Sequence, residues 1–185
     1  MGPYDEIVLS CWLGFLITWA ICAMTFKSGG RQSQTRAGRG IRLLLAVAVL
    51  VSIELGVAFA WQPFGAYGRD VAAAGAALCV GGLAFAIWAR VAIGSNWGMP
   101  MTQHESPELV TSGPYRFVRH PIYTGLGAMM IGTALAHPFA ALACACWVAY
   151  SVFSALREER DMEQRFPGVY DEYKRRSKML VPFLL

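Results

Sequence analysis

Two polar segments of this 185-residue sequence hold residues whose types and spacing could do chemistry. The first is GPYRFVRHPIYTGLG, residues 113–127, which places two arginines, a histidine and two tyrosines at the start of an apolar run. The second, LREER at 156–160, follows the next apolar run. Charged groups at the edge of hydrocarbon are costly and usually have a partner or a function. If the two runs form an antiparallel helical hairpin, the histidine and the glutamates meet at one end of it, and this meeting point is the candidate site.

The composition indicates the class of protein that must position these residues. Hydrophobic residues make up 56% of the chain and charged residues 15%, with a mean hydropathy of +0.42. A soluble domain is about 25% charged, so the sequence predicts an integral membrane protein. Its basic residues gather in a few short loops, which favours membrane orientation over nucleic-acid binding. All five cysteines lie within apolar runs and form no Cys-x-x-Cys pair, so no metal site is expected.

The apolar runs predict an all-α fold with about five transmembrane helices, because roughly 20 residues cross a bilayer as a helix. The expected spans are residues 7–26, 43–61, 71–88, 122–136 and 139–156. We expect one membrane domain over residues 1–185: three N-terminal spans in 1–94, then a polar loop, a tight helical hairpin and a tail in 95–185. The tail alternates apolar, aromatic and basic residues, which is typical of an interfacial helix.

Two further features concern the spans themselves. Ala73, Ala77 and Gly81 recur every four residues and predict a face for close helix packing. Glu54 interrupts the second span and should face the interior of the bundle. Acidic rather than basic residues precede the first span, so we expect it to be retained and not cleaved as a signal peptide.

Loop charge predicts the orientation. Basic residues crowd segments 27–42 and 90–119 and the tail, and such segments stay in the cytoplasm. This places the N-terminus outside and both halves of the candidate site on the cytoplasmic side. The expected location is a bacterial inner membrane.

The C-terminal half, over residues 107–182, resembles the isoprenylcysteine carboxyl methyltransferase family. The resemblance rests on the order and spacing of Leu-Val-Thr-Ser-Gly at 109–113, Tyr115, Arg-His-Pro-x-Tyr-x-Gly at 119–125, Glu-Glu at 158–159, and Phe166 before Tyr170-x-x-Tyr173. Gly-x-Gly at 125–127 together with the paired glutamates is also similar to the related phospholipid N-methyltransferases.

The resemblance implies S-adenosylmethionine as cofactor. The residues expected to bind it are Leu109, Val110, Tyr115, Arg119, His120, Pro121, Ile122, Tyr123 and Glu158. Their chemistry suits the cofactor: tyrosine rings can face its sulfonium, a cation–π contact worth about 0.5–2 kcal/mol. Glu158 can pair with its ammonium, and Arg119 or His120 can meet its carboxylate or adenine.

The acceptor is expected to be a lipophilic molecule or lipidated substrate that enters laterally from the bilayer. In the eukaryotic prenylcysteine enzymes an arginine thought to hold the substrate carboxylate stands where this chain has Ser154. We therefore expect Arg157 to hold a carboxylate acceptor of the isoprenylcysteine type. An amine acceptor must instead lose a proton, and Glu159 or Glu54 could then act as the base.

Three alternatives stay open from the sequence. The chain could be an amine-methylating phospholipid enzyme with the same pocket, a relative of NADPH-dependent sterol reductases, or a membrane scaffold without catalysis. The sequence predicts membrane lipids as surroundings and no nucleic-acid partner, and it does not indicate an oligomeric state.

Overall fold

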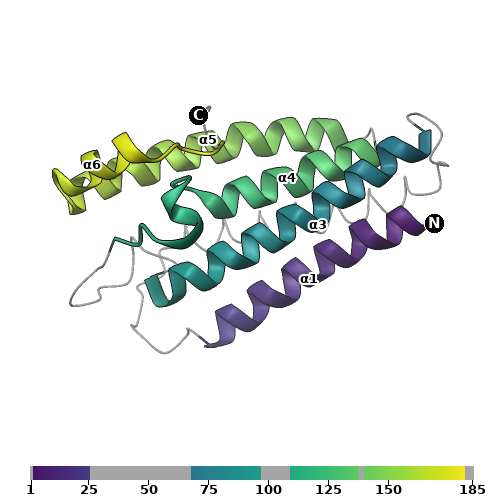
Figure 1. The fold of residues 1–185 in the computed structure, drawn as a ribbon, viewed down its shortest axis with the longest axis horizontal. Coiled ribbons are helices and arrows are strands. Elements are labelled where there is room, and N and C mark those ends of the chain that lie inside the picture. The colour runs from purple at the N-terminus through teal and green to yellow at the C-terminus, as the bar shows by residue number, and fades with distance from the viewer. Residues whose placement is uncertain (1, 26–67, 97–108, 138–139, 182–185) are drawn as a thin grey trace, which may run out of the picture.

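The computed structural model describes residues 2–25, 68–96, 109–137 and 140–181, which form a bundle of long helices. In chain order the elements are α1 (Pro3–Thr25), α3 (Gly68–Ile93), the short 3-10 helices η1 (Gly94–Asn96) and η2 (Gly113–Arg116), α4 (Pro121–Ala136), α5 (Ala140–Arg165) and α6 (Val169–Arg176). Figure 1 shows α1, α3, α4 and α5 side by side in that order, with α6 against the end of α5. Apart from an isolated β-bridge between Val118 and Lys178, regular structure in the described residues is helical, which confirms the predicted all-α class.

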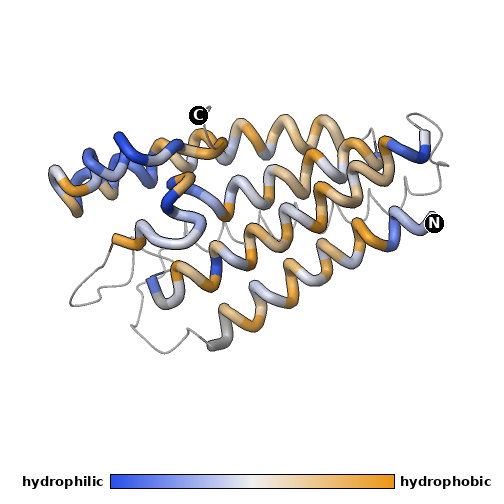
Figure 2. The backbone as a smooth tube through the Cα atoms, viewed as in Figure 1, coloured by the Kyte–Doolittle hydropathy of each residue, from blue (hydrophilic) through white to orange (hydrophobic). Residues whose placement is uncertain are grey.

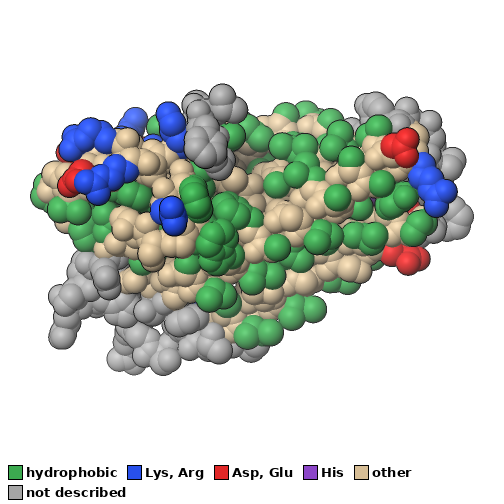
Figure 3. Space-filling model, in the orientation of Figure 1, with side chains coloured by type: hydrophobic (Ala, Val, Ile, Leu, Met, Phe, Trp, Pro, Cys, Tyr) green, Lys and Arg blue, Asp and Glu red, His purple; other side chains and the backbone are tan. Residues whose placement is uncertain are grey.

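Three of the described helices, α1, α3 and α5, are long and apolar enough to cross a membrane, and α4 is a shorter apolar helix. Figure 2 shows apolar residues along the middle of the bundle and polar residues at its two ends. Large apolar side chains such as Leu13, Leu142 and Phe153 are exposed on its outside, where lipid tails would cover them, and Figure 3 shows apolar side chains spread over one such face. The chain is therefore an all-α integral membrane protein. The expected second span, with Glu54, and the basic segment 27–42 lie outside the described residues, so the count of five spans stays a prediction.

The helices α3 and α4 approach each other closely at glycines. A Cβ atom on Gly75 would lie 2.5 Å from the carbonyl oxygen of Gly132, and one on Gly82 would lie 2.6 Å from that of Gly125. Both distances are shorter than a carbon and an oxygen tolerate. Backbones can come this near only where side chains are absent, the usual arrangement of helices packed in lipid.

This contact corrects the predicted packing face. Ala77 and Gly81 are exposed, and a Cβ atom on Gly81 would meet no atom within 4 Å. The glycines that contact α4, Gly75 and Gly82, lie seven residues apart on the neighbouring stripe of α3. Successive residues differ by about 100° around a helix, so the stripe that contacts α4 depends on how α3 is rotated in the bundle.

Polar contacts inside the bundle hold α4 in place. Trp12 Nε1 of α1 donates a hydrogen bond to Thr133 Oγ1 of α4 at 3.0 Å, and the Cys79 thiol of α3 donates to the Met129 carbonyl at 3.1 Å. Pro121 opens α4, where the missing N–H of proline costs nothing. His120 thus stands directly before a firmly held helix.

The tail contains a C-terminal helix after a break at Pro167-Gly168, as the sequence predicts, but α5 before it is longer than expected. α5 continues as one helix to Arg165, beyond the expected end of the span at 156, and therefore carries both glutamates of the candidate site. The chain then breaks at Gly168, whose φ is +77°, and α6 begins at Val169. The tail can fold back over the site because of this break.

Candidate functional site

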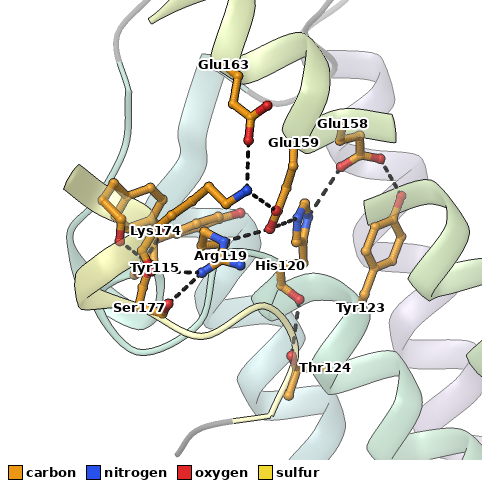
Figure 4. A network of polar contacts seen from close by, with 11 residues as sticks. Tyr115, Arg119, His120, Tyr123, Thr124, Glu158, Glu159, Glu163, Lys174 and Ser177 are labelled. Carbon is orange, nitrogen blue, oxygen red and sulfur yellow. Dashed lines mark hydrogen bonds and ion pairs between the residues drawn. The ribbon is translucent and has the colours of Figure 1, made fainter. Parts of the chain in front are cut away.

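The candidate site lies at one end of the bundle, where α4 begins, α5 ends and the tail returns (Figure 4). The chain segment that leads into the site is the turn η2. Gly113 opens η2 with φ +61°, and a Cβ atom there would lie 3.3 Å from that of Ala92, so this position suits glycine. Tyr115 is buried behind the turn, and its carbonyl accepts a hydrogen bond from the Tyr173 hydroxyl at 2.6 Å.

Residues 177–180, which we name the tail strap, run beside the loop that carries the candidate residues. Arg119 N–H donates to the Lys178 carbonyl at 2.8 Å, and His120 N–H donates to the Met179 carbonyl at 3.1 Å. The Thr124 hydroxyl donates to the Leu180 carbonyl at 2.5 Å. The tail strap is therefore hydrogen-bonded both to the loop between η2 and α4 and to the first turn of α4.

His120 lies between the two glutamates of α5. Its Nδ1 is 3.4 Å from Oε2 of Glu158, and its Nε2 is 3.5 Å from Oε1 of Glu159. Burial lowers the pKa of His120, but the two carboxylates outweigh this, so its pKa is raised above the ordinary value of 6.5. The ring therefore holds a positive charge more readily than a free histidine does.

Tyr123 completes the more open side of this cluster. Its hydroxyl donates a hydrogen bond of 2.6 Å to Oε1 of Glu158, and its ring lies nearly parallel to that of His120, 5.8 Å from it. The side chain of Glu158 is 41% exposed. The open side therefore presents a carboxylate beside the face of the Tyr123 ring, which suits a cationic group.

Arg119 and Glu159 form the buried side. Arg119 Nε lies 2.6 Å from Glu159 Oε1, and their side chains are 9% and 6% exposed. Arg119 Nη1 also donates to the Ser177 carbonyl at 2.5 Å. Lys174 of α6 reaches Glu159 Oε2 at 3.2 Å and Glu163 at 2.7 Å. Chiefly the bond to Glu163 raises the pKa of Lys174 above its usual range.

The remaining predicted site residues lie around this cluster. Leu109 and Val110 are half-buried before η2, Pro121 is buried at the start of α4, and Ile122 packs against the apolar core. Arg157 instead lies on the outer side of α5, with its guanidinium carbon 5.8 Å from the centre of the exposed Phe153 ring. The structure thus brings together five predicted residues, Arg119, His120, Tyr123, Glu158 and Glu159, and turns Arg157 away from them.

Three residues near the site were not foreseen. Lys174 and Ser177 join through the tail, as described above. Arg90, at the end of α3, is only 2% exposed and donates to the Gly94 carbonyl at 2.8 Å. Burial raises the pKa of the Tyr115 hydroxyl, and the positive charge of Arg90 partly opposes this rise. An arginine that ends an apolar run is a visible signal for Arg90, whereas nothing in the order of residues shows how the tail folds back.

Comparison with known proteins places this arrangement in a family. Residues 71–168, just over half of the chain, match the family model described as phospholipid methyltransferase. The fold and this match place the chain among the integral membrane proteins of the methyltransferase class. Within that class it belongs to the phospholipid methyltransferase family.

Two curated relatives are similar to parts of the chain. Protein-S-isoprenylcysteine O-methyltransferase B of Arabidopsis thaliana is 38% identical over 87 residues, which are 44% of this chain and 43% of that protein. Nickel-cobalt-cadmium resistance protein NccN of Alcaligenes xylosoxydans xylosoxydans is 35% identical over 100 residues, which are 50% of this chain and 45% of that protein. The match therefore spans less than half of either relative. The predicted resemblance to isoprenylcysteine and phospholipid methyltransferases is confirmed.

Proposed function

We propose that this protein transfers a methyl group from S-adenosylmethionine to a lipophilic acceptor in the membrane. Family membership supports methyl transfer. The observation that carries the choice of cofactor is the open side of the cluster, where the half-exposed Glu158 lies beside the stacked rings of His120 and Tyr123.

These residues fit the charges of the cofactor. S-adenosylmethionine has an ammonium, a sulfonium and a carboxylate. In the proposed complex Glu158 pairs with the ammonium, the Tyr123 ring faces the sulfonium, and His120 offers positive charge to the carboxylate. The bound cofactor would supply an activated methyl group, while the chain's own residues align donor and acceptor and exclude water. Alignment alone can lower such a barrier by about 7–11 kcal/mol.

Two acceptors are supported by different observations. A carboxylate of the isoprenylcysteine type is supported by the similarity to the Arabidopsis enzyme. It would need Arg157 to leave Phe153 and turn toward the cluster, because Arg119 and Lys174 are already paired. A phospholipid amine is supported by the family and by Ser154, a neutral residue at the position of the eukaryotic arginine. We propose both as candidates, with lateral entry from the bilayer beside α5.

The orientation that we propose follows from charge. The basic tail, with Arg175, Arg176 and Lys178, and segment 27–42 would lie in the cytoplasm of a bacterium, with the N-terminus outside its inner membrane. The cluster is at the same end of the bundle as the tail (Figure 1). Soluble S-adenosylmethionine would then reach it from the cytoplasm.

Calorimetric titration of the purified protein with S-adenosylhomocysteine tests the cofactor. We expect Glu158→Ala and His120→Ala each to weaken binding at least tenfold, because each removes a charge that the ligand needs. Tyr123→Phe should weaken binding less than Tyr123→Ala, since the ring face remains. Glu172→Ala, which removes an exposed carboxylate paired with Arg176, is the control and should bind like the parent.

Binding of NADPH in place of S-adenosylhomocysteine, or parent-like binding by both the Glu158 and His120 variants, would refute the proposal. The acceptor is then identified by offering a prenylcysteine analogue and phosphatidylethanolamine with radiolabelled S-adenosylmethionine. Arg157→Ala should raise the KM for the prenylcysteine analogue if the acceptor is a carboxylate. It should have no effect if only the amine lipid is methylated.

A further inference from the structure

The two adjacent glutamates of α5 have opposite surroundings. Glu158 is 41% exposed and contacts Tyr123 and His120, whereas Glu159 is 6% exposed. Neighbouring residues on a helix point about 100° apart, so one carboxylate looks toward the open side and the other toward the tail. The two carboxylates of this Glu-Glu motif therefore have different functions: only that of Glu158 is accessible to a ligand on the open side.

The carboxylate of Glu159 is already occupied on both oxygens. Oε1 accepts the 2.6 Å bond from Arg119 and faces His120 Nε2 at 3.5 Å, and Oε2 faces Lys174 Nζ at 3.2 Å. A carboxylate that is paired with cations gives up its charge reluctantly and is a weak base. An acceptor would have to displace Arg119 or Lys174 to reach it.

The contacts of Arg119 connect Glu159 to the tail strap. The same guanidinium that binds Glu159 also donates to the carbonyls of Ser177, at 2.5 Å, and Lys174, at 3.4 Å. The next residue, His120, has its own N–H bound to the strap at Met179. The His120 ring is thus placed by its backbone and by the Tyr123 ring beside it, and its Nε2 lies 3.5 Å from Glu159 Oε1, a charge contact without a geometric hydrogen bond.

We propose that Glu159 is a positioning residue and not a catalytic base: with Arg119 and Lys174 it binds the tail to α5 and holds the His120 ring in the orientation that the open side of the site requires. This inference rests on the proposed function where it concerns S-adenosylhomocysteine. Its structural half, that Glu159 acts on His120, stands independently of any ligand.

The groups that face His120 determine how the pKa of its ring changes when Glu159 is removed. They are Glu158 and Glu159 from α5, Tyr123 from α4 and the adjacent Arg119, with Lys174 of α6 acting through Glu159. Glu159→Gln removes one of the two carboxylates that favour the charged ring. The pKa of His120 should therefore fall, and the ring should lose its proton at a lower pH than in the parent.

The first test uses the ligand-free protein. The nitrogen chemical shifts of ¹⁵N-labelled histidine report ring protonation, and His120→Gln assigns the signal among the three histidines. We expect the titration midpoint of His120 to move down in Glu159→Gln and to be largely restored in Glu159→Asp. Glu172→Gln should leave it unchanged. An unchanged midpoint in Glu159→Gln would overturn the proposal.

The second test separates positioning from catalysis. Glu159→Gln should weaken S-adenosylhomocysteine binding about tenfold, with a loss that grows as the pH rises, and Glu159→Asp should recover most of it. Turnover lost at unchanged affinity, with an unchanged pH profile, would make Glu159 the base and overturn the proposal. If the parent itself does not bind, the proposed function fails, while the histidine titration still decides the role of Glu159.

A milder variant covers the case in which Glu159→Gln does not fold. Lys174 is partly exposed, so Lys174→Met removes an outer contact of Glu159 and leaves the buried pair intact. We expect it to weaken S-adenosylhomocysteine binding at least threefold. Arg176→Met, two residues along on the exposed side of α6, should have no effect. Equal affinities in the two variants would count against the positioning role.

Discussion

Replacement of Gly82 by alanine should destabilise the protein at the contact between α3 and α4. A Cβ atom at this position would lie 2.6 Å from the Gly125 carbonyl oxygen, 2.9 Å from the Met129 nitrogen and 3.0 Å from the Ala128 Cβ. The first two obstacles are backbone atoms, which cannot swing away as a flexible side chain could. The two helices would have to move apart.

The adjacent Gly81 is the matched control. A Cβ atom there meets nothing within 4 Å. Both substitutions gain the same helix propensity, about 0.8–1.0 kcal/mol for alanine over glycine. Their difference therefore isolates the clash, which we take as an overpacking cost of about 1–3 kcal/mol. Each kcal/mol corresponds to about 2–4 °C in Tm for a chain of this size, so Gly82→Ala should melt several degrees below Gly81→Ala.

The same comparison can be made from the other helix. A Cβ atom on Gly125 would lie 2.7 Å from the Gly82 carbonyl oxygen, whereas one on Gly127 is unobstructed. Thermal unfolding in detergent, followed by circular dichroism, gives Tm for all four variants. Because α4 follows directly after His120, Gly125→Ala should also weaken S-adenosylhomocysteine binding and Gly127→Ala should not. A Gly82→Ala protein that melts as high as Gly81→Ala would refute the close contact on which this reasoning depends.

Two further predictions concern His120 and the membrane. Because the folded state raises the pKa of His120, its contribution to stability is full below the unfolded value of about 6.5 and is lost as the pH rises through the raised value. The Tm difference between the parent and His120→Gln should therefore be largest between about pH 5.5 and 6.5, where both glutamates are ionised, and should shrink on going to pH 9; a difference that widens with pH would contradict the assignment. For orientation, Arg69→Cys and Arg175→Cys, each in a background without the native cysteines, should differ toward a membrane-impermeant maleimide on intact cells: labelling of Arg69→Cys alone agrees with a cytoplasmic tail, and labelling of Arg175→Cys alone reverses the topology.

The sequence by itself determined the class of the protein and the five residues that meet in its site, Arg119, His120, Tyr123, Glu158 and Glu159. Long apolar runs with few charges predict membrane helices, because a helix satisfies the hydrogen-bonding groups of its own backbone in lipid. The hairpin follows from the short turn at His137 and Pro138, and it brings the glutamates of α5 back to His120 and Tyr123 whatever the details of packing. That meeting depends on chain direction alone, so order and spacing suffice to predict it.

The tertiary structure decided which site residues are exposed to a ligand and which are buried in ion pairs. Glu158 and Glu159 are identical in type and adjacent in sequence, yet rotation of α5 exposes one and buries the other against Arg119. The same dependence on rotation moved the packing stripe of α3 from Gly81 to Gly82 and turned Arg157 toward Phe153. A local pattern specifies spacing along a helix, but the face that meets a partner is set by contacts from segments distant in the chain, such as the tail strap on the His120 loop.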